Sequence, residues 1–206
     1  MQMEMHHGHD DGQPPLSSLS DRLRSATHPT HESLDQSIMA AKPFESLENY
    51  GLFLKVQHGI HRDVEPLFKT AALANLFPGL KERSRLEAVE QDLADLGMQV
   101  PGYSDLPATS TSAQLGIPEA IGWLYVIEGS NLGAAFLLKY ARKMGLSETH
   151  GARHLAEPPE GRAPYWKAFK GALNAVRLTE AEEARAVAAA EAAFARVQAL
   201  VRQHLS

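Results

Sequence analysis

Apolar residues recur three and four positions apart along most of the chain after residue 17, which is the spacing of amphipathic helices. The first predicted helix has Ser18 or Ser20 as its possible N-cap. One face of it carries a repeating set of side chains: Leu23, Thr27, His31, Leu34 and Ile38. Pro29 falls inside this pattern, so we expect the helix either to begin at Pro29 or to be kinked there.

The rest of the chain predicts further helices, separated by loops rich in Pro, Gly and Ser. Their expected ranges are 47–70, 82–96, 118–145, 165–175 and 179–204. Gly97 and Gly145 follow the ends of two of them, and Pro118 begins another. Thr179 and Glu182 predict a capping box for the last helix. No stretch alternates with the strand period over a useful length. We therefore expect an all-α, single-domain, multi-helix fold.

Composition narrows the possible classes of protein. Residues 1–16 are polar and rich in His, Asp and Gly, so we expect a disordered tail there and one domain over 17–206. A net charge of −5 gives no reason to expect nucleic acid as a partner. The absence of Cys excludes disulfides, thiolate catalysis and iron–sulfur clusters. No apolar run reaches the ~18 residues of a membrane span, and no secretory signal is visible. We expect a cytoplasmic monomer.

The segment Glu128–Ala135 is unusual for a helix that only packs. It contains Gly129 and Gly133, and each interior glycine costs ~1 kcal/mol relative to Ala. Glycines four residues apart strip one face of side chains, so that a flat group can lie on the backbone. The alternative is close packing between helices, and the glycines taken alone favour this alternative.

His31 changes that balance. It lies on the apolar face of the first predicted helix, with Asp35 four residues later. A carboxylate in that place accepts a hydrogen bond from one ring nitrogen and orients the other toward a metal. An imidazole, a carboxylate partner and a bare glycine face together describe a planar metal macrocycle held between two helices.

Several segments resemble the heme oxygenases, and in particular their bacterial, Neisseria-type branch. Leu23-Arg24-Ser25-Ala26-Thr27 followed by Thr30-His31-Glu32 looks like the proximal helix of that family. The run from Gly122 to Ala135 (GWLYVIEGSNLGAA) is similar to the distal helix. Further matches are Lys42-Pro43-Phe44, Glu48-Asn49-Tyr50, Gln91–Gly97 and Glu148–Leu155. The resemblance covers about residues 20–205, and it implies a fold with heme between the proximal and distal helices.

The resemblance assigns a role to each candidate residue. His31 is the axial ligand of the heme iron, with Asp35 as its partner, and Gly129 and Gly133 form the distal backbone. Ser130, Asn131 and His61 are implied to order a distal water network. Residues implied to contact heme are Arg24 and Tyr125 at the propionates, Phe194 on the macrocycle and Lys42, which matches a propionate-binding Lys of a relative with rotated heme.

The implied reaction is the opening of heme b at a meso carbon by O2, with electrons from an external donor, to give biliverdin, Fe²⁺ and CO. Arg24 and Tyr125 favour opening at the α position, whereas Lys42 weakens that expectation. Basic residues after the distal helix suggest a face for a ferredoxin- or flavoprotein-type reductase: Lys139, Arg142, Lys143 and Arg153. Iron acquisition and chromophore supply for a phytochrome both remain open as physiological roles.

Three positions depart from the pattern of relatives. The mammalian branch has Asp directly after the first distal glycine, where this chain has Ser130. A Tyr that helps to hold a propionate in the Neisseria-type branch is Val197 here, and Pro29 is unusual in a proximal helix.

Three other interpretations have less support in the sequence. A di-iron bundle needs two Glu-x-x-His motifs, and the sequence contains one such spacing, Glu4 and His7 in the tail. His58, His61 and Glu65 fall on neighbouring helix positions, but no convincing further ligands accompany them. A non-catalytic heme carrier would keep His31 but would not need the bare glycine face.

Overall fold

The computed structural model describes residues 17–105, 107–109 and 115–205. These residues form seven α-helices and no β-strand: α1 (Leu19–Ala40), α2 (Leu47–Phe68), α3 (Ala71–Leu76), α4 (Leu86–Asp95), α5 (Ile117–Lys143), α6 (Arg162–Ala175) and α7 (Glu180–His204). Two short 3₁₀ turns, η1 (Lys81–Arg83) and η2 (Arg153–Leu155), lie in the connections. The all-α expectation is confirmed. The expected tail, residues 1–16, lies outside the described part.

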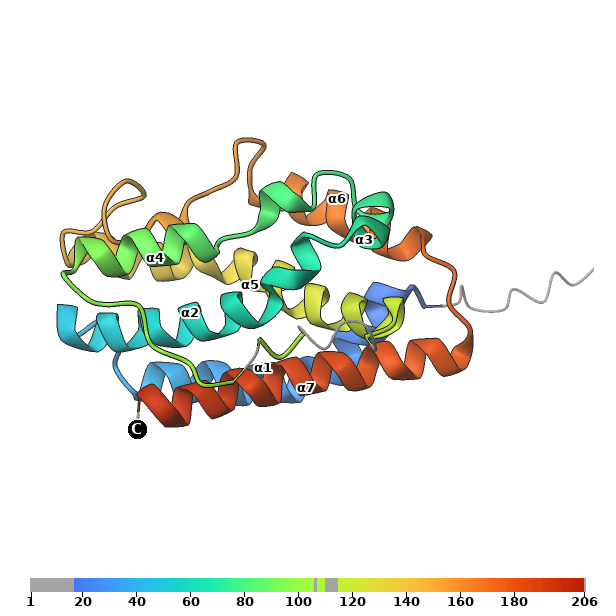
Figure 1. The fold of residues 1–206 in the computed structure, drawn as a ribbon, viewed down its shortest axis with the longest axis horizontal. Coiled ribbons are helices and arrows are strands. Elements are labelled where there is room, and N and C mark those ends of the chain that lie inside the picture. The colour runs from blue at the N-terminus through green and yellow to red at the C-terminus, as the bar shows by residue number, and fades with distance from the viewer. Residues whose placement is uncertain (1–16, 106, 110–114, 206) are drawn as a thin grey trace, which may run out of the picture.

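Three long helices form the framework of the molecule (Figure 1). α7 packs on both α5 and α1, and the α5–α7 contact is the most extensive in the fold. It is close because Gly122 faces α7 directly: a Cβ at Gly122 would lie 2.2 Å from the Ala186 carbonyl oxygen. α2 also lies on α7, and α4 covers α2 from the other side.

α1 is continuous through Pro29, so the expectation that the helix begins at that residue is wrong. Ser18 forms a capping box with Asp21, which satisfies backbone N–H groups at the start of the helix. Leu23, Thr27 and Leu34 are buried on the inner face. This burial and capping outweigh the cost of about 3 kcal/mol for proline inside a helix.

Most other boundaries follow the sequence signals, but the helix expected over 82–96 begins only at Leu86, after the separate turn η1. Gly97 has φ +67° after α4, and the Met98 N–H donates to the Leu93 carbonyl at 2.9 Å, which closes a Schellman turn. The Thr179–Glu182 capping box is present at the start of α7. The short helix α3 was not predicted, because six residues are too few to display a helical period.

Candidate functional site

The candidate site lies where α1 and α5 diverge, a region that we call the wedge. The two helices run in the same direction, from right to left in Figure 1, and α5 rises away from α1 along its length. Near their N-terminal ends they come together, where the Tyr125 side chain lies beside Thr27. One helical turn later, His31 on α1 and Gly129 on α5 reach the same level, because each is four residues further along.

Gly133 faces open space, and Gly129 is contacted only loosely, by a side chain of α6. A Cβ built on Gly133 would meet nothing within 4 Å among the described residues, and one on Gly129 would meet Trp166 Cη2 at 3.8 Å. Gly122, by contrast, is filled completely by α7. Helix packing therefore explains Gly122 and does not explain the two glycines of the bare face.

Large apolar side chains border this face. Leu132 is 44% exposed and Phe136 is 51% exposed, although both belong to the long apolar helix of the core. At 100° per residue, these two side chains and Gly133 leave α5 within one broad sector of its surface. Exposed apolar area next to uncovered backbone is suited to a flat, largely apolar ligand.

The His31 side chain is exposed at the wedge and is not part of the buried core. Its side chain is 55% exposed, and its ring packs edge-on against Phe194, with centroids 5.9 Å apart. Its Nδ1 lies 3.3 Å from an Asp35 carboxylate oxygen. With Nδ1 oriented by Asp35, Nε2 is the nitrogen left to bind a metal. An axial ligand, open backbone and an apolar border are what heme requires, so the residues present fit this group.

Arg24 and Tyr125 are brought together at the narrow end of the wedge. Burial raises the pKa of the Tyr125 hydroxyl, and the Arg24 guanidinium opposes that shift, which places the two groups near one another. Arg24 forms no ion pair with another side chain of the described residues. A cation and a hydroxyl at this place can bind a carboxylate of the ligand.

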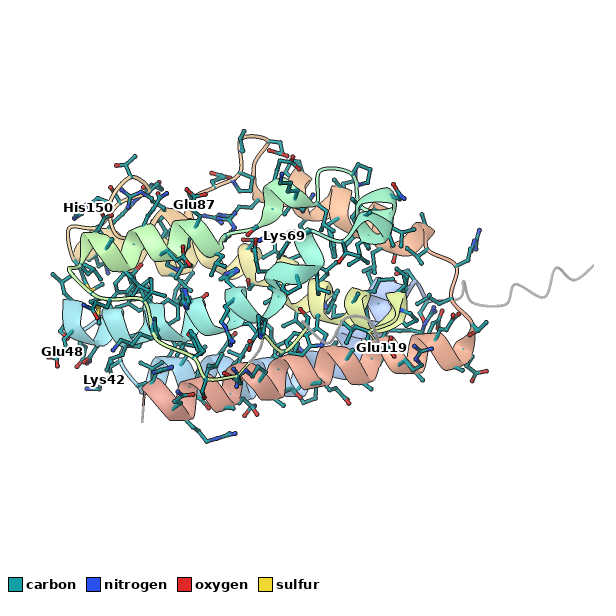
Figure 2. All side chains as sticks on the ribbon, viewed as in Figure 1. Lys42, Glu48, Lys69, Glu87, Glu119 and His150 are labelled. Atoms are coloured by element: carbon teal, nitrogen blue, oxygen red, sulfur yellow. The ribbon has the colours of Figure 1, made fainter. Side chains whose placement is uncertain are left out.

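Some of the predicted site residues do not lie at the wedge. Lys42 lies beyond the end of α1, close to the start of α2 (Figure 2), where its Nζ pairs with Glu45 at 2.9 Å. The Asn131 side chain is buried and leaves α5 about 200° around the helix from Gly129, away from the bare face. The Ser130 hydroxyl donates to the Ile127 carbonyl at 2.7 Å. Phe194 is buried behind His31.

His61 is a buried, neutral imidazole on α2. Burial, with smaller contributions from His154, Arg85 and His58, lowers its pKa to about 3. Its Nδ1 has no hydrogen-bond partner among the described residues. His61 can therefore act as a hydrogen-bonding group but not as a strong acid near neutral pH.

Two interactions that hold the glycine segment were missed from the sequence. Arg83 donates to the Glu128 carboxylate at 2.6 Å, and both side chains are buried. Arg162 donates to the Asn131 carbonyl at 3.0 Å. Glu128 could have been noticed, because a carboxylate in an apolar helix needs a partner. The partners themselves come from distant segments and carry no local signal.

The metal-cluster alternative finds no support in the part of the chain that is described. No group of three His, Asp or Glu side chains there could hold a metal ion. His58 is instead paired with the Tyr103 hydroxyl and Glu90. Glu4 and His7, the di-iron spacing, lie outside the described residues.

Among the described helices, α5 is the one long and apolar enough to cross a membrane. It is a central helix of the fold, packed along α7, and 56% of its most apolar stretch is buried. The core of the molecule thus accounts for its apolar character.

Comparisons with known proteins point to one family. The heme oxygenase family model matches residues 17–203. The heme oxygenase PigA of Pseudomonas aeruginosa is 45% identical over 177 residues, covering 86% of this chain and 88% of the relative. A heme oxygenase of Xanthomonas campestris pv. campestris is 30% identical over 148 residues, covering 72% of this chain and 86% of the relative.

Solved structures of heme oxygenases are also similar to this chain. The NO- and CO-bound heme oxygenase of Neisseria meningitidis has a TM-score of 0.85 and 42% identity, covering 91% of this chain and 92% of that chain. The heme oxygenase of Leptospira interrogans, at 17% identity and a TM-score of 0.72, shares the fold. The chain therefore belongs to the heme oxygenase family, whose reaction is the degradation of heme to biliverdin.

Proposed function

We propose that heme binds in the wedge between α1 and α5, with His31 as the axial ligand and Gly129 and Gly133 on the opposite face. The observation that carries this proposal is the pairing of an exposed, carboxylate-oriented imidazole with helix backbone that, among the described residues, is open at Gly133 and only loosely contacted at Gly129. Leu132 and Phe136 provide apolar contact for the macrocycle.

Bound heme supplies both the iron that activates O2, with electrons from an external donor, and the ring that is opened. The neutral imidazole of His31, as an axial ligand, lacks the strong electron donation by which a thiolate favours O–O cleavage. The two glycines let the α5 backbone approach the reacting face closely, which restricts the space there. No acidic side chain projects from this face, so protons reach it through hydrogen-bonded water.

We assign this water to Ser130, Asn131 and His61. The Ser130 oxygen can still accept a hydrogen bond while its hydroxyl donates to Ile127. Asn131 lies on the far side of α5, so its contribution requires water or backbone groups between. His61 stays neutral over the working range of pH because burial keeps its pKa low.

Opening at the α position is the regiochemistry we propose. Arg24 and Tyr125 lie at the narrow end of the wedge, where they can hold the propionates and fix the in-plane rotation of the ring. The part of α1 from His31 to Ala40 already spans roughly 13 Å, and Lys42 lies beyond it, paired with Glu45. This position favours Arg24 as the propionate partner.

For the electron donor we propose a ferredoxin- or flavoprotein-type reductase that docks at the C-terminal end of α5. Lys139, Arg142 and Lys143 are exposed there. Arg153 contributes less, because Asp92 and Asp95 already neutralise it. We further propose a cytoplasmic monomer that serves iron acquisition or chromophore supply.

The deciding experiment replaces His31 with Ala and compares it with His28→Ala. The two histidines lie on the same helix, are similarly exposed and each pair with a carboxylate four residues later. We expect heme titration to show loss of imidazole ligation, and of biliverdin formation, in His31→Ala alone. An unchanged heme spectrum in His31→Ala would refute the assignment.

A further inference from the structure

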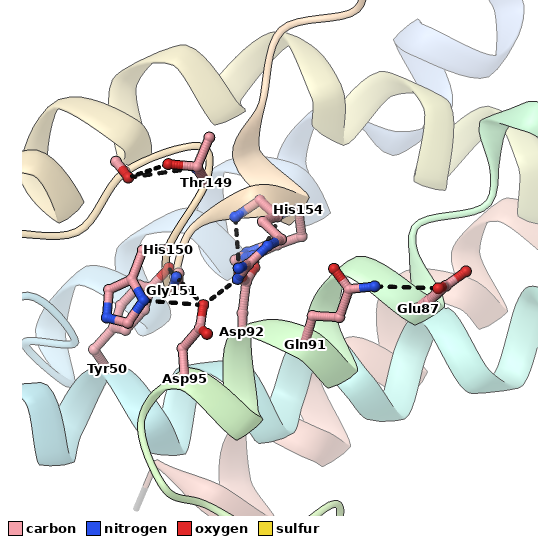
Figure 3. Close-up of polar contacts among 11 residues, drawn as sticks. Tyr50, Glu87, Gln91, Asp92, Asp95, Thr149, His150, Gly151 and His154 are labelled. Carbon is pink, nitrogen blue, oxygen red and sulfur yellow. Dashed lines mark hydrogen bonds and ion pairs between the residues drawn. The ribbon is translucent and has the colours of Figure 1, made fainter.

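A second polar cluster lies behind the wedge, where η2 packs against α4 and α5. Its centre is His154, which is buried together with its partner Asp92. His154 Nδ1 lies 2.8 Å from the Asp92 carboxylate, and the His154 backbone N–H donates to the same oxygen at 3.0 Å (Figure 3). The Phe53 ring on α2 closes the cluster on one side, with ring centroids 6.3 Å apart.

The protonation of this pair follows from its surroundings. Burial raises the pKa of Asp92, but its hydrogen bonds with the His154 ring and with the backbone N–H groups of Arg153 and His154 lower it overall. Burial lowers the pKa of His154 more than Asp92 can raise it. Asp92 is therefore an anion and His154 is neutral. Because a carboxylate only accepts hydrogen bonds, the single ring proton of His154 must be on Nδ1, which leaves a lone pair on Nε2.

That lone pair has no protein donor. His154 Nε2 and His61 Nδ1 are both fully buried, and neither has a hydrogen-bond partner among the described residues. The two rings lie in one region of the fold, since each is close enough to the Arg85 guanidinium for that charge to lower its pKa. Two unpartnered nitrogens in one buried region are the usual setting of an ordered internal water molecule.

The Arg85 guanidinium sets the orientation of such a water. Arg85 donates to the His154 carbonyl at 2.7 Å, and its charge lowers the pKa of both His154 and His61. A cation near both rings would attract the oxygen end of a water dipole and favour O–H groups directed toward the imidazoles.

We infer that His61 and His154 enclose a buried water that donates one O–H to each ring, and that Asp92 and His154 thereby position His61. With its Nδ1 accepting, His61 must carry its proton on Nε2. Asp92, at one end of this chain of hydrogen bonds, thus determines that His61 donates from Nε2 at the other end. Asp92 and His154 are positioning residues. Their effect on heme turnover rests on the proposed function, whereas the water and the ring protons do not.

The first test uses heme-free protein labelled with ¹⁵N in histidine. We expect NMR to show His154 as the Nδ1–H tautomer and His61 as the Nε2–H tautomer, with water cross-relaxation to both rings. His154→Phe should release His61 into a mixture of tautomers. The matched control is His150→Phe on the same segment, where the side chain is 58% exposed, and it should leave His61 unchanged. An Nδ1–H tautomer at His61 in the unmodified protein, or no bound water at the rings, overturns the inference, and neither result needs a folded variant.

The second test uses the heme complex. His154→Phe should slow biliverdin formation about tenfold, the lower end of the range for carboxylate–histidine positioning, while heme affinity stays unchanged. His154→Gln, whose side-chain oxygen can accept the same O–H, should restore much of the rate. Equal rates in His154→Phe and the unmodified protein would overturn the positioning role. If the unmodified protein does not ligate heme through His31, the proposed function fails while the tautomer result stands.

Discussion

At the residue scale, the most demanding group is Glu128, a carboxylate next to Gly129 in the most apolar helix of the molecule. Only 1% of its side chain is exposed, and burial raises its pKa although the nearby Arg83 charge opposes the shift. Arg83 in turn lies over the Tyr165 ring at 3.7 Å. The pair ties the start of the bare face to η1 and α6, so it stabilises the segment that we propose to face heme.

Replacing Arg83 with Met should therefore destabilise the fold strongly. It leaves Glu128 buried without its cation, for which a loss of about 3–5 kcal/mol is typical. Urea unfolding measures the loss. The double variant Arg83→Met with Glu128→Leu should recover most of it, because no uncompensated charge remains. A single variant as stable as the unmodified protein would contradict this account of the pair.

His61 makes stability depend on pH. Its pKa is about 3 in the folded protein against 6.5 for an ordinary histidine, so between these values the unfolded chain binds a proton that the folded chain does not. Stability contributed by neutral His61 is thus full above pH 6.5 and falls as the pH drops toward 3. His61→Leu should reduce the slope of unfolding free energy against pH by about 1.4 kcal/mol per unit near pH 5. An unchanged slope would show that His61 is not a buried neutral base.

Part of the candidate site could be predicted from the residue types in the sequence. His31, Asp35 and the two glycines could be chosen from the sequence because their signals are local: spacing on one helix and the cost of interior glycine. The links from Arg83 to Glu128 and from Asp92 to His154 could not, since 45 and 62 residues separate the partners. Neither segment carries a local sequence signal that identifies its partner.

At the element scale, α5 uses glycine in two different ways. Near its N-terminus, Gly122 lets α7 approach to a distance that no side chain would allow. Two turns later the glycines are uncovered, and the helix is weaker there than it would be with Ala. Helical period and caps predicted the existence and most boundaries of α5 and α7, but they could not show which glycine is packed.

Two alanine variants of α5 should consequently have opposite effects in heme-free protein. Gly133→Ala should stabilise by up to ~1 kcal/mol, because it gains helix propensity and its Cβ meets nothing. Gly122→Ala should destabilise by about 1–3 kcal/mol, because its Cβ would overlap the Ala186 carbonyl. Thermal or urea unfolding compares them directly. Destabilisation by Gly133→Ala would mean that its face is covered after all.

At the scale of the whole molecule, the fold brings α1 and α5 together through α7, which packs on both. The sequence predicted an all-α domain and both site helices. It did not predict that α1 passes unbroken through Pro29, because the compensating burial against α7 depends on the complete fold. Nor did it show that Lys42 lies at the opposite end of α1 from Arg24.

A bulky side chain placed in the wedge should reduce turnover without unfolding the protein. Gly133→Leu adds an apolar side chain to an exposed helix position with free space around it, so the heme-free fold should remain intact by circular dichroism. Biliverdin formation should fall by at least about tenfold, because a mispositioned reactant commonly costs that much or more. A normal yield from Gly133→Leu would contradict the proposal that this backbone faces the reaction.

The contact between Thr27 and Tyr125 fixes the spacing of α1 and α5 at one end of the site. It lies near the N-terminal ends of two helices that extend four turns or so beyond it. Since α7 packs on both helices, their separation at the open end is set jointly by this contact and by α7. An opened, non-planar tetrapyrrole takes up more height than a flat ring, so its release would require α1 and α5 to separate further at that end.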